Sequence, residues 1–127
     1  MKDVNPTAHD MKALIRPLVS LHNKCEKAQQ KCQPGTWQHA RLQHNREALS
    51  YALAHLRQEV PSLQSPTIAE QQAMKQTLEN LCDVTEQALQ KSTSGTASHT
   101  LLCNRLRALR VAASVLHTPF SDTEIDP

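Results

Sequence analysis

The chain has 127 residues, only three aromatic side chains and two glycines, and a net charge of +2 at pH 7. This length suits one domain with a single core. The scarcity of turn residues argues against a β-sandwich or an α/β fold, no apolar stretch approaches the ~20 residues that span a membrane, and the nearly balanced charge is not typical of a nucleic-acid-binding domain.

The N-terminal segment has no apolar stretch behind Lys2, so no signal peptide is expected. The sequence therefore predicts a cytosolic protein. In that compartment free thiols are the default state of Cys25, Cys32, Cys82 and Cys103.

Apolar residues recur with a spacing of three or four in four stretches, which predicts four amphipathic helices. The predicted ranges are 7–32, 36–60, 66–91 and 97–117. A polar tail, 118–127, follows Leu116 and His117. The periodic stretches together indicate an all-α domain over residues 1–127.

Local signals place the helix boundaries. Thr7 and Thr36 are predicted N-caps. Ser65 is expected to cap the third helix, with Pro66 at its first position. Pro17 lies within the first range, where it either kinks one helix or separates two.

The connections between the predicted helices are short, which favours antiparallel neighbours. The expected architecture is an up-down-up-down four-helix bundle. The helical-hairpin pattern repeats along the chain, but the residues of the two halves are not expected to repeat.

Two His-Cys pairs are weak candidates for metal ligands. His22 and Cys25 are three residues apart, and His99 and Cys103 are four apart, so each pair shares a helix face. Two such pairs could complete a tetrahedral zinc site. Because the compact zinc-ligand motifs are absent and cysteine also serves as a small core residue, we predict no metal and no other cofactor.

Arg110 and His117 have the Arg-x6-His spacing that resembles the motif of HEPN-type ribonucleases, which are also small helical bundles. That resemblance implies that the two residues act together on RNA at a dimer interface. Val111 departs from the family pattern, which has a polar residue there. The alternative is an exposed arginine and a histidine placed favourably at a helix C-terminus.

Arg105 falls inside the apolar stripe of the fourth predicted helix. It could pair with Glu86 or Glu79 of the third helix as a buried ion pair. It could instead mark a groove that binds a partner, or extend from the stripe edge to water.

The sequence contains no phosphate-binding glycine loop, di-iron carboxylate pattern or nucleophile motif. We therefore predict a non-enzymatic protein that binds another protein through a helix groove. In length, low aromatic content and long helices it resembles bacterial export chaperones of the flagellar and type III secretion kind. The candidate contact residues are Leu101, Arg105, Val111 and Val115. The same residues could form the seam of a homodimer.

A nucleic-acid accessory factor, or an inhibitor encoded by a mobile element, is the alternative from another class. It would use the basic fourth helix through Arg105, Arg107 and Arg110. Further cations on the second helix would assist, namely Arg41, Arg46 and Arg57.

Overall fold

The computed structural model describes residues 8–57 and 67–116, and within these ranges the chain is entirely helix and turn. The helices are α1 (Ala8–Gln30), α2 (Trp37–Leu56), α3 (Ile68–Lys91) and α4 (Ala97–Val115). The predicted all-α fold is confirmed, and the predicted N-cap Thr7 and the tail 118–127 lie outside the described residues. No helix in the described ranges is long and apolar enough to cross a membrane.

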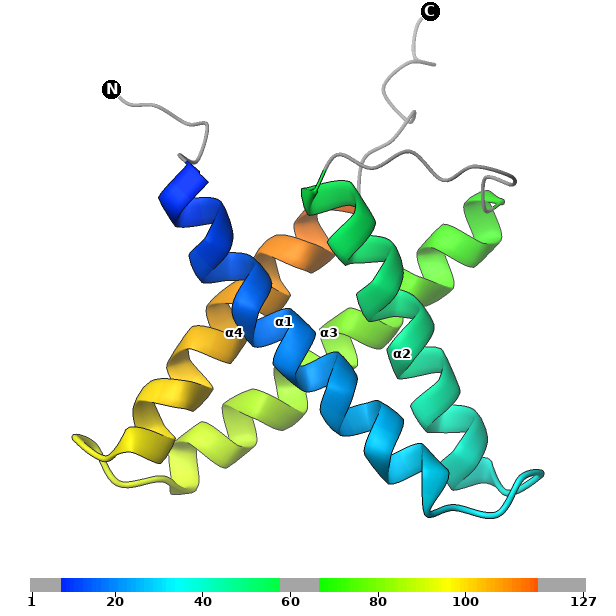
Figure 1. The fold of residues 1–127 in the computed structure, drawn as a ribbon, viewed down its shortest axis with the longest axis horizontal. Helices are drawn as coiled ribbons and strands as arrows, with labels where there is room; N and C mark the ends of the chain where they lie inside the picture. Colours follow the sequence, from blue (N-terminus) through cyan, green and yellow to red (C-terminus); the bar gives the residue numbers. More distant parts are fainter. Residues whose placement is uncertain (1–7, 58–66, 117–127) are drawn as a thin grey trace, which may run out of the picture.

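The four helices form two hairpins, α1–α2 and α3–α4, with the up-down-up-down course that the short connections predict (Figure 1). Both hairpin turns lie at the same end of the molecule, the α3–α4 turn at the lower left and the α1–α2 turn at the lower right of Figure 1. The hairpins cross each other instead of lying parallel, so each helix of one hairpin leaves part of its length uncovered by the other hairpin (Figure 1).

Each hairpin turn combines a left-handed glycine with a threonine cap. Gly35 and Gly95 have φ angles of 91° and 87°, a conformation that only glycine adopts without strain. Thr36 and Thr96 follow, and each side chain accepts a hydrogen bond from a backbone N–H of the next helix. The gaps between the predicted ranges, 33–35 and 92–96, contain the two glycines, and these breaks and the predicted cap at Thr36 are confirmed.

The predicted start of the third helix at Ser65 and Pro66 is wrong. Thr67 is the N-cap of α3, and its hydroxyl accepts from the Glu70 backbone N–H at 3.0 Å while the Glu70 carboxylate accepts from the Thr67 N–H at 2.8 Å. This reciprocal capping box satisfies two donors at once, whereas a cap at Ser65 would place Ile68, which has no side-chain acceptor, at the third helical position.

Pro17 lies inside an uninterrupted α1. A proline removes one backbone hydrogen bond from a helix, but α1 continues on both sides of the position where that bond is missing. The leading segment and the rest of α1 are therefore one helix.

The residues of the two halves do repeat, which the sequence analysis did not predict. Residues 8–56 align without a gap on residues 68–116, at an offset of 60, and 15 of these 49 positions are identical. The identical positions, numbered in the first half, are Ala13, Leu18, Leu21, Glu26, Ala28, Gln30, Lys31, Gly35, Thr36, His39, Leu42, Ala48, Leu49, Ala52 and Leu56. Self-similarity at a fixed offset indicates duplication of one supersecondary unit, here a helical hairpin.

The helix contacts follow the same duplication. The α1–α2 packing matches the α3–α4 packing, and the α1–α4 packing matches that of α2 with α3. The two hairpins are thus related by an approximate two-fold rotation (Figure 1).

The core is built from equivalent residues of the two halves. The largest fully buried side chains are Leu18 with its equivalent Leu78, and Leu49 with its equivalent Leu109. In the described residues α2 and α4 also approach each other across the centre, while α1 and α3 do not. Each of these two helices carries a pair of alanines spaced four apart, whose small side chains let the backbones come close. All four are fully buried: Ala48, Ala52, Ala108 and Ala112.

Candidate functional site: a basic groove between α1 and α4

An open groove with a volume of about 690 Å³ runs between α1 and α4, and we call it the α1–α4 groove. Its apolar surface comes from Ile15, Val19 and Leu101. The two α1 residues are half-buried against the core, whereas Leu101 is 48% exposed. A large side chain with that exposure, next to two further apolar side chains, is a surface that an apolar partner could cover.

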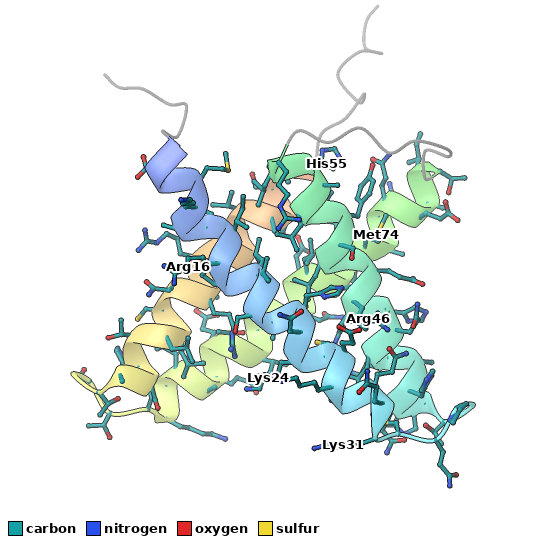
Figure 2. The ribbon with its side chains drawn as sticks, viewed as in Figure 1. Arg16, Lys24, Lys31, Arg46, His55 and Met74 are labelled. Atoms are coloured by element: carbon teal, nitrogen blue, oxygen red, sulfur yellow. The ribbon has the colours of Figure 1, made fainter. Side chains whose placement is uncertain are left out.

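Cationic side chains surround this apolar surface. Arg16, Lys24 and Lys27 come from α1, and Arg105 comes from α4. Figure 2 shows Arg16 and Lys24 on the side of α1 that faces the α3–α4 hairpin. The remaining lining residues are polar and uncharged, so none of the described residues that line the groove carries a carboxylate. The positive potential of the α1–α4 groove is therefore not neutralised by its own walls.

The approximate two-fold places a second groove, of about 440 Å³, between α2 and α3. Among the described residues that line this α2–α3 groove, Arg41 is the one arginine or lysine, and it lies over the ring of Trp37 at 5.7 Å. The two grooves occupy equivalent places and differ in charge. Fold geometry alone therefore does not explain the cations of the α1–α4 groove.

Alignment of the two halves shows which positions account for the difference in charge between the grooves. The four cations of the α1–α4 groove align with uncharged residues of the other half: Gln76, Val84, Gln87 and Asn45. The two remaining polar positions of α1, Ser20 and Asn23, align with Asn80 and Asp83. The duplicated halves have kept their core leucines and alanines, but they differ at these groove positions.

Arg105 lies at the base of the α1–α4 groove and is only 9% exposed. Its Nε atom is buried and has no hydrogen-bond partner among the described residues. Of the three alternatives for Arg105, the buried ion pair with Glu86 or Glu79 is not formed, because Glu86 pairs with Arg110 at 3.4 Å and Glu79 with Lys75 at 2.6 Å. Burial lowers the pKa of Arg105, an effect partly opposed by the nearby Cys25.

Leu101 and Arg105 are one helical turn apart and both line the groove. Val111 and Val115, the other two predicted contact residues, lie further along α4, where they are half-buried and pack against the core. The structure therefore brings together two of the four predicted contact residues on one open surface.

The three α4 arginines of the nucleic-acid alternative do not share one surface. Arg105 is buried beside α1, Arg107 is exposed, and Arg110 reaches across to Glu86 of α3. His117, the other member of the HEPN-like pair, lies outside the described residues.

The additional cations of α2 are occupied in different ways. Arg46 donates to the buried Gln29 side chain at 2.5 Å and lies 3.9 Å from Glu26. Its Nε has no hydrogen-bond partner among the described residues. Arg41 lies over Trp37, and Arg57 caps the C-terminus of α2.

The two His-Cys pairs are not assembled into a ligand set. His22 interacts with Ser50 at 3.2 Å and His99 with Ser92 at 2.7 Å. Cys25 is buried, where a hydrogen bond with Asn45 partly opposes the rise in its pKa caused by burial, while Cys103 is exposed. Across residues 8–57 and 67–116, no group of three or more His, Cys, Asp or Glu side chains could hold a metal ion.

Sequence reasoning missed the contribution of α1 to the groove. Ile15, Val19 and the three α1 cations lie within the predicted helix 7–32, but no functional role was predicted for them. The 60-residue repeat is the signal that could have found them, because it shows where α1 carries Lys24 and Lys27 and its equivalent α3 carries Val84 and Gln87.

The fold and groove together define a duplicated helical-hairpin bundle with one basic and one nearly uncharged groove. No family model, curated protein or solved structure matches the chain.

Proposed function

We propose that this chain is a non-enzymatic, cytosolic protein-binding module whose α1–α4 groove receives an amphipathic helix of a partner protein. The observation that carries the proposal is the combination of an apolar surface with four surrounding cations and, among the described lining residues, no carboxylate. Amphipathic helices bind to proteins by laying an apolar face into such a groove between helices.

The charge of the groove selects the kind of helix. Four cations on the walls favour a partner helix that carries aspartate or glutamate beside its apolar face. Rim charges of this type contribute mainly to the association rate and to partner choice. The apolar contacts with Leu101, Ile15 and Val19 would provide most of the affinity.

An adaptor or export-chaperone-like role is consistent with this proposal, because such proteins hold a helix of a client on the surface of a helical bundle. The client itself would be identified by capture from the native lysate, before and after nuclease treatment. Two pairs of charge reversals would test whether the α1–α4 groove is the surface that holds it.

The test pair is Lys24→Glu with Lys27→Glu, both in the α1–α4 groove. The control pair is Lys31→Glu with Lys91→Glu, two exposed residues at equivalent positions of the repeat that line neither groove. Both pairs change the net charge equally. We expect the control to retain the captured protein and the groove pair to lose it; retention by both variants would contradict the proposal.

Nucleic-acid binding is a second candidate, supported by the absence of acidic residues from α4 and by the four cations of the groove. Phosphate contacts release counterions, so binding would weaken steeply with salt. Partners that disappear on nuclease treatment, together with steeply salt-dependent binding of an oligonucleotide, would favour this candidate.

A further inference from the structure

We propose that Arg105 is a receptor for one carboxylate of the docked partner helix, an inference that rests on the proposed helix-binding function. The starting point is an imbalance in the described part of the chain: Arg105 is about nine-tenths buried, yet no acidic residue pairs with it and its Nε has no acceptor. Buried guanidinium groups are normally paired, because an unpaired buried charge is costly.

Packing does not require a charge at this place. The equivalent position of the other half is Asn45, a neutral residue that forms a hydrogen bond with the Cys25 side chain. The duplicated fold therefore accommodates an uncharged side chain at the same point of the other hairpin. Packing therefore does not account for the guanidinium of Arg105, whose Nη groups are the donors open to a group that enters the groove.

The position of Arg105 relative to Leu101 defines a spacing. The two residues are four apart on α4 and both line the α1–α4 groove, so they lie about 6 Å apart along one helix face. A docked helix would contact Leu101 with an apolar residue and Arg105 with a glutamate, and these two residues would also be four apart. The recognised feature is therefore an apolar residue and a carboxylate separated by one helical turn.

A carboxylate side chain fits this site better than a nucleic-acid backbone. A guanidinium at the base of a groove, with Leu101 on the same wall, suits one acidic side chain that reaches inward and accepts two hydrogen bonds. A phosphate backbone needs a row of accessible cations. The exposed cations of the groove that could form such a row, Arg16, Lys24 and Lys27, all lie on α1. Neither Arg107 nor Arg110 extends it beside the buried Arg105, because neither lines the groove.

The test uses two synthetic peptides of about 18 residues, roughly 27 Å long as helices. Both are alanine-based, labelled with a fluorophore and carry leucines on one face; one has glutamate four residues after each leucine and the other has glutamine there. Affinities for the full chain are measured by fluorescence polarisation. Because a hydrogen bond to a charged group stabilises more than one to a neutral group, we expect the wild-type protein to prefer the glutamate peptide by about tenfold.

Three variants distinguish the possible causes. Arg105→Asn copies the equivalent residue of the other half and should remove the preference for glutamate. Arg105→Lys retains the charge without the planar fork and should keep part of it. Leu101→Ala should weaken both peptides about equally and leave the preference unchanged.

The outcomes separate the two proposals. If Arg105→Asn keeps the full preference while Leu101→Ala weakens binding, Arg105 is not the carboxylate receptor but the helix-binding function stands. If neither peptide binds the wild-type protein at up to about 1 mM, both proposals fail. The NMR signal of the Arg105 Nε–H gives a direct readout: the glutamate peptide should shift it, and a shift caused only by a single-stranded oligonucleotide would replace the carboxylate with a phosphate.

Discussion

Thr96 caps α4 in the same way that Thr36 caps α2. The Thr36 hydroxyl accepts from the His39 backbone N–H at 3.2 Å, and the Thr96 hydroxyl accepts from the His99 backbone N–H at 3.1 Å. Each hydroxyl also donates to a turn carbonyl, that of Gln33 at 2.8 Å or that of Thr93 at 2.7 Å. The duplication has thus preserved a whole turn, from the left-handed glycine to the first helical hydrogen bond.

Replacing either threonine with alanine should lower the free energy of unfolding by about 1 kcal/mol, because each cap satisfies one otherwise unpaired N–H. The free energy of unfolding of the double variant should fall by the sum of the two effects, since the turns lie on opposite sides of the molecule, at its lower left and lower right in Figure 1. Urea unfolding followed by circular dichroism measures both quantities. A double variant that differs from the sum by more than about 1 kcal/mol would contradict the independence of the turns.

The equivalent core leucines should also behave alike. Leu49→Ala and Leu109→Ala each remove a fully buried side chain, and each should destabilise the protein by about 2–5 kcal/mol. Urea unfolding again provides the measurement. Leu101→Ala, the same substitution at an exposed position, is the control and should lower the free energy of unfolding far less. A similar loss of stability at all three positions would contradict the assigned core.

Much of the fold could be predicted from the sequence, because helical periodicity and two glycines are local signals. The predicted ranges 36–60 and 66–91 correspond to α2 and α3, although α2 ends at Leu56, before the predicted residue 60, and α3 begins at Ile68. Thr67 and Glu70 form a capping box that can be read from their spacing, but Ser65 followed by Pro66 offered a competing start two residues earlier.

Less of the candidate site could be predicted. The exposure of Leu101 and the burial of Arg105 both depend on the angle at which the two hairpins cross, which no local pattern encodes. Val111 and Val115 have the same apolar character as Leu101, yet the crossing buries them against the core. The pairing of Arg110 with Glu86 likewise follows from the register of α3 against α4.

Removing the charge of Arg105 should stabilise the free protein. Arg105→Met keeps the length of the side chain and removes a buried donor that lacks a partner, so the free energy of unfolding should rise by about 1–3 kcal/mol. The exposed Arg107→Met is the matched control and should change stability by no more than about 0.5 kcal/mol. A loss of stability in Arg105→Met would mean that the guanidinium stabilises the free fold.

Cysteine reactivity should follow burial. Burial raises the pKa of the Cys25 thiol above its ordinary value of 9.0 and also raises that of Cys82, whereas Cys103 is exposed. The thiolate is the reactive form, so iodoacetamide should modify Cys103 first and Cys25 last. Mass spectrometry at several pH values checks this order, and early modification of Cys25 in the folded protein would contradict its placement.

The raised pKa of Cys25 also has a consequence for stability. The folded state favours the neutral thiol, so this contribution is complete below the pKa of the unfolded thiol, near 9, and is lost as the pH rises through the higher folded value. Stability of the wild-type protein should therefore fall more steeply above about pH 9 than that of Cys25→Ala. If the free energies of unfolding of the two proteins, measured with urea, fell equally steeply with pH in this range, the raised pKa of Cys25 would be contradicted.

The most direct test of a helix-binding α1–α4 groove places a photo-crosslinking amino acid at position 101 and, in a separate protein, at position 41. These positions are equivalent in the repeat and line the two different grooves. The account predicts that the captured partner crosslinks to position 101 through an acidic amphipathic helix and not to position 41. Crosslinking of that partner mainly at position 41, or of position 101 only to a second copy of the chain or to nucleic acid, would contradict it.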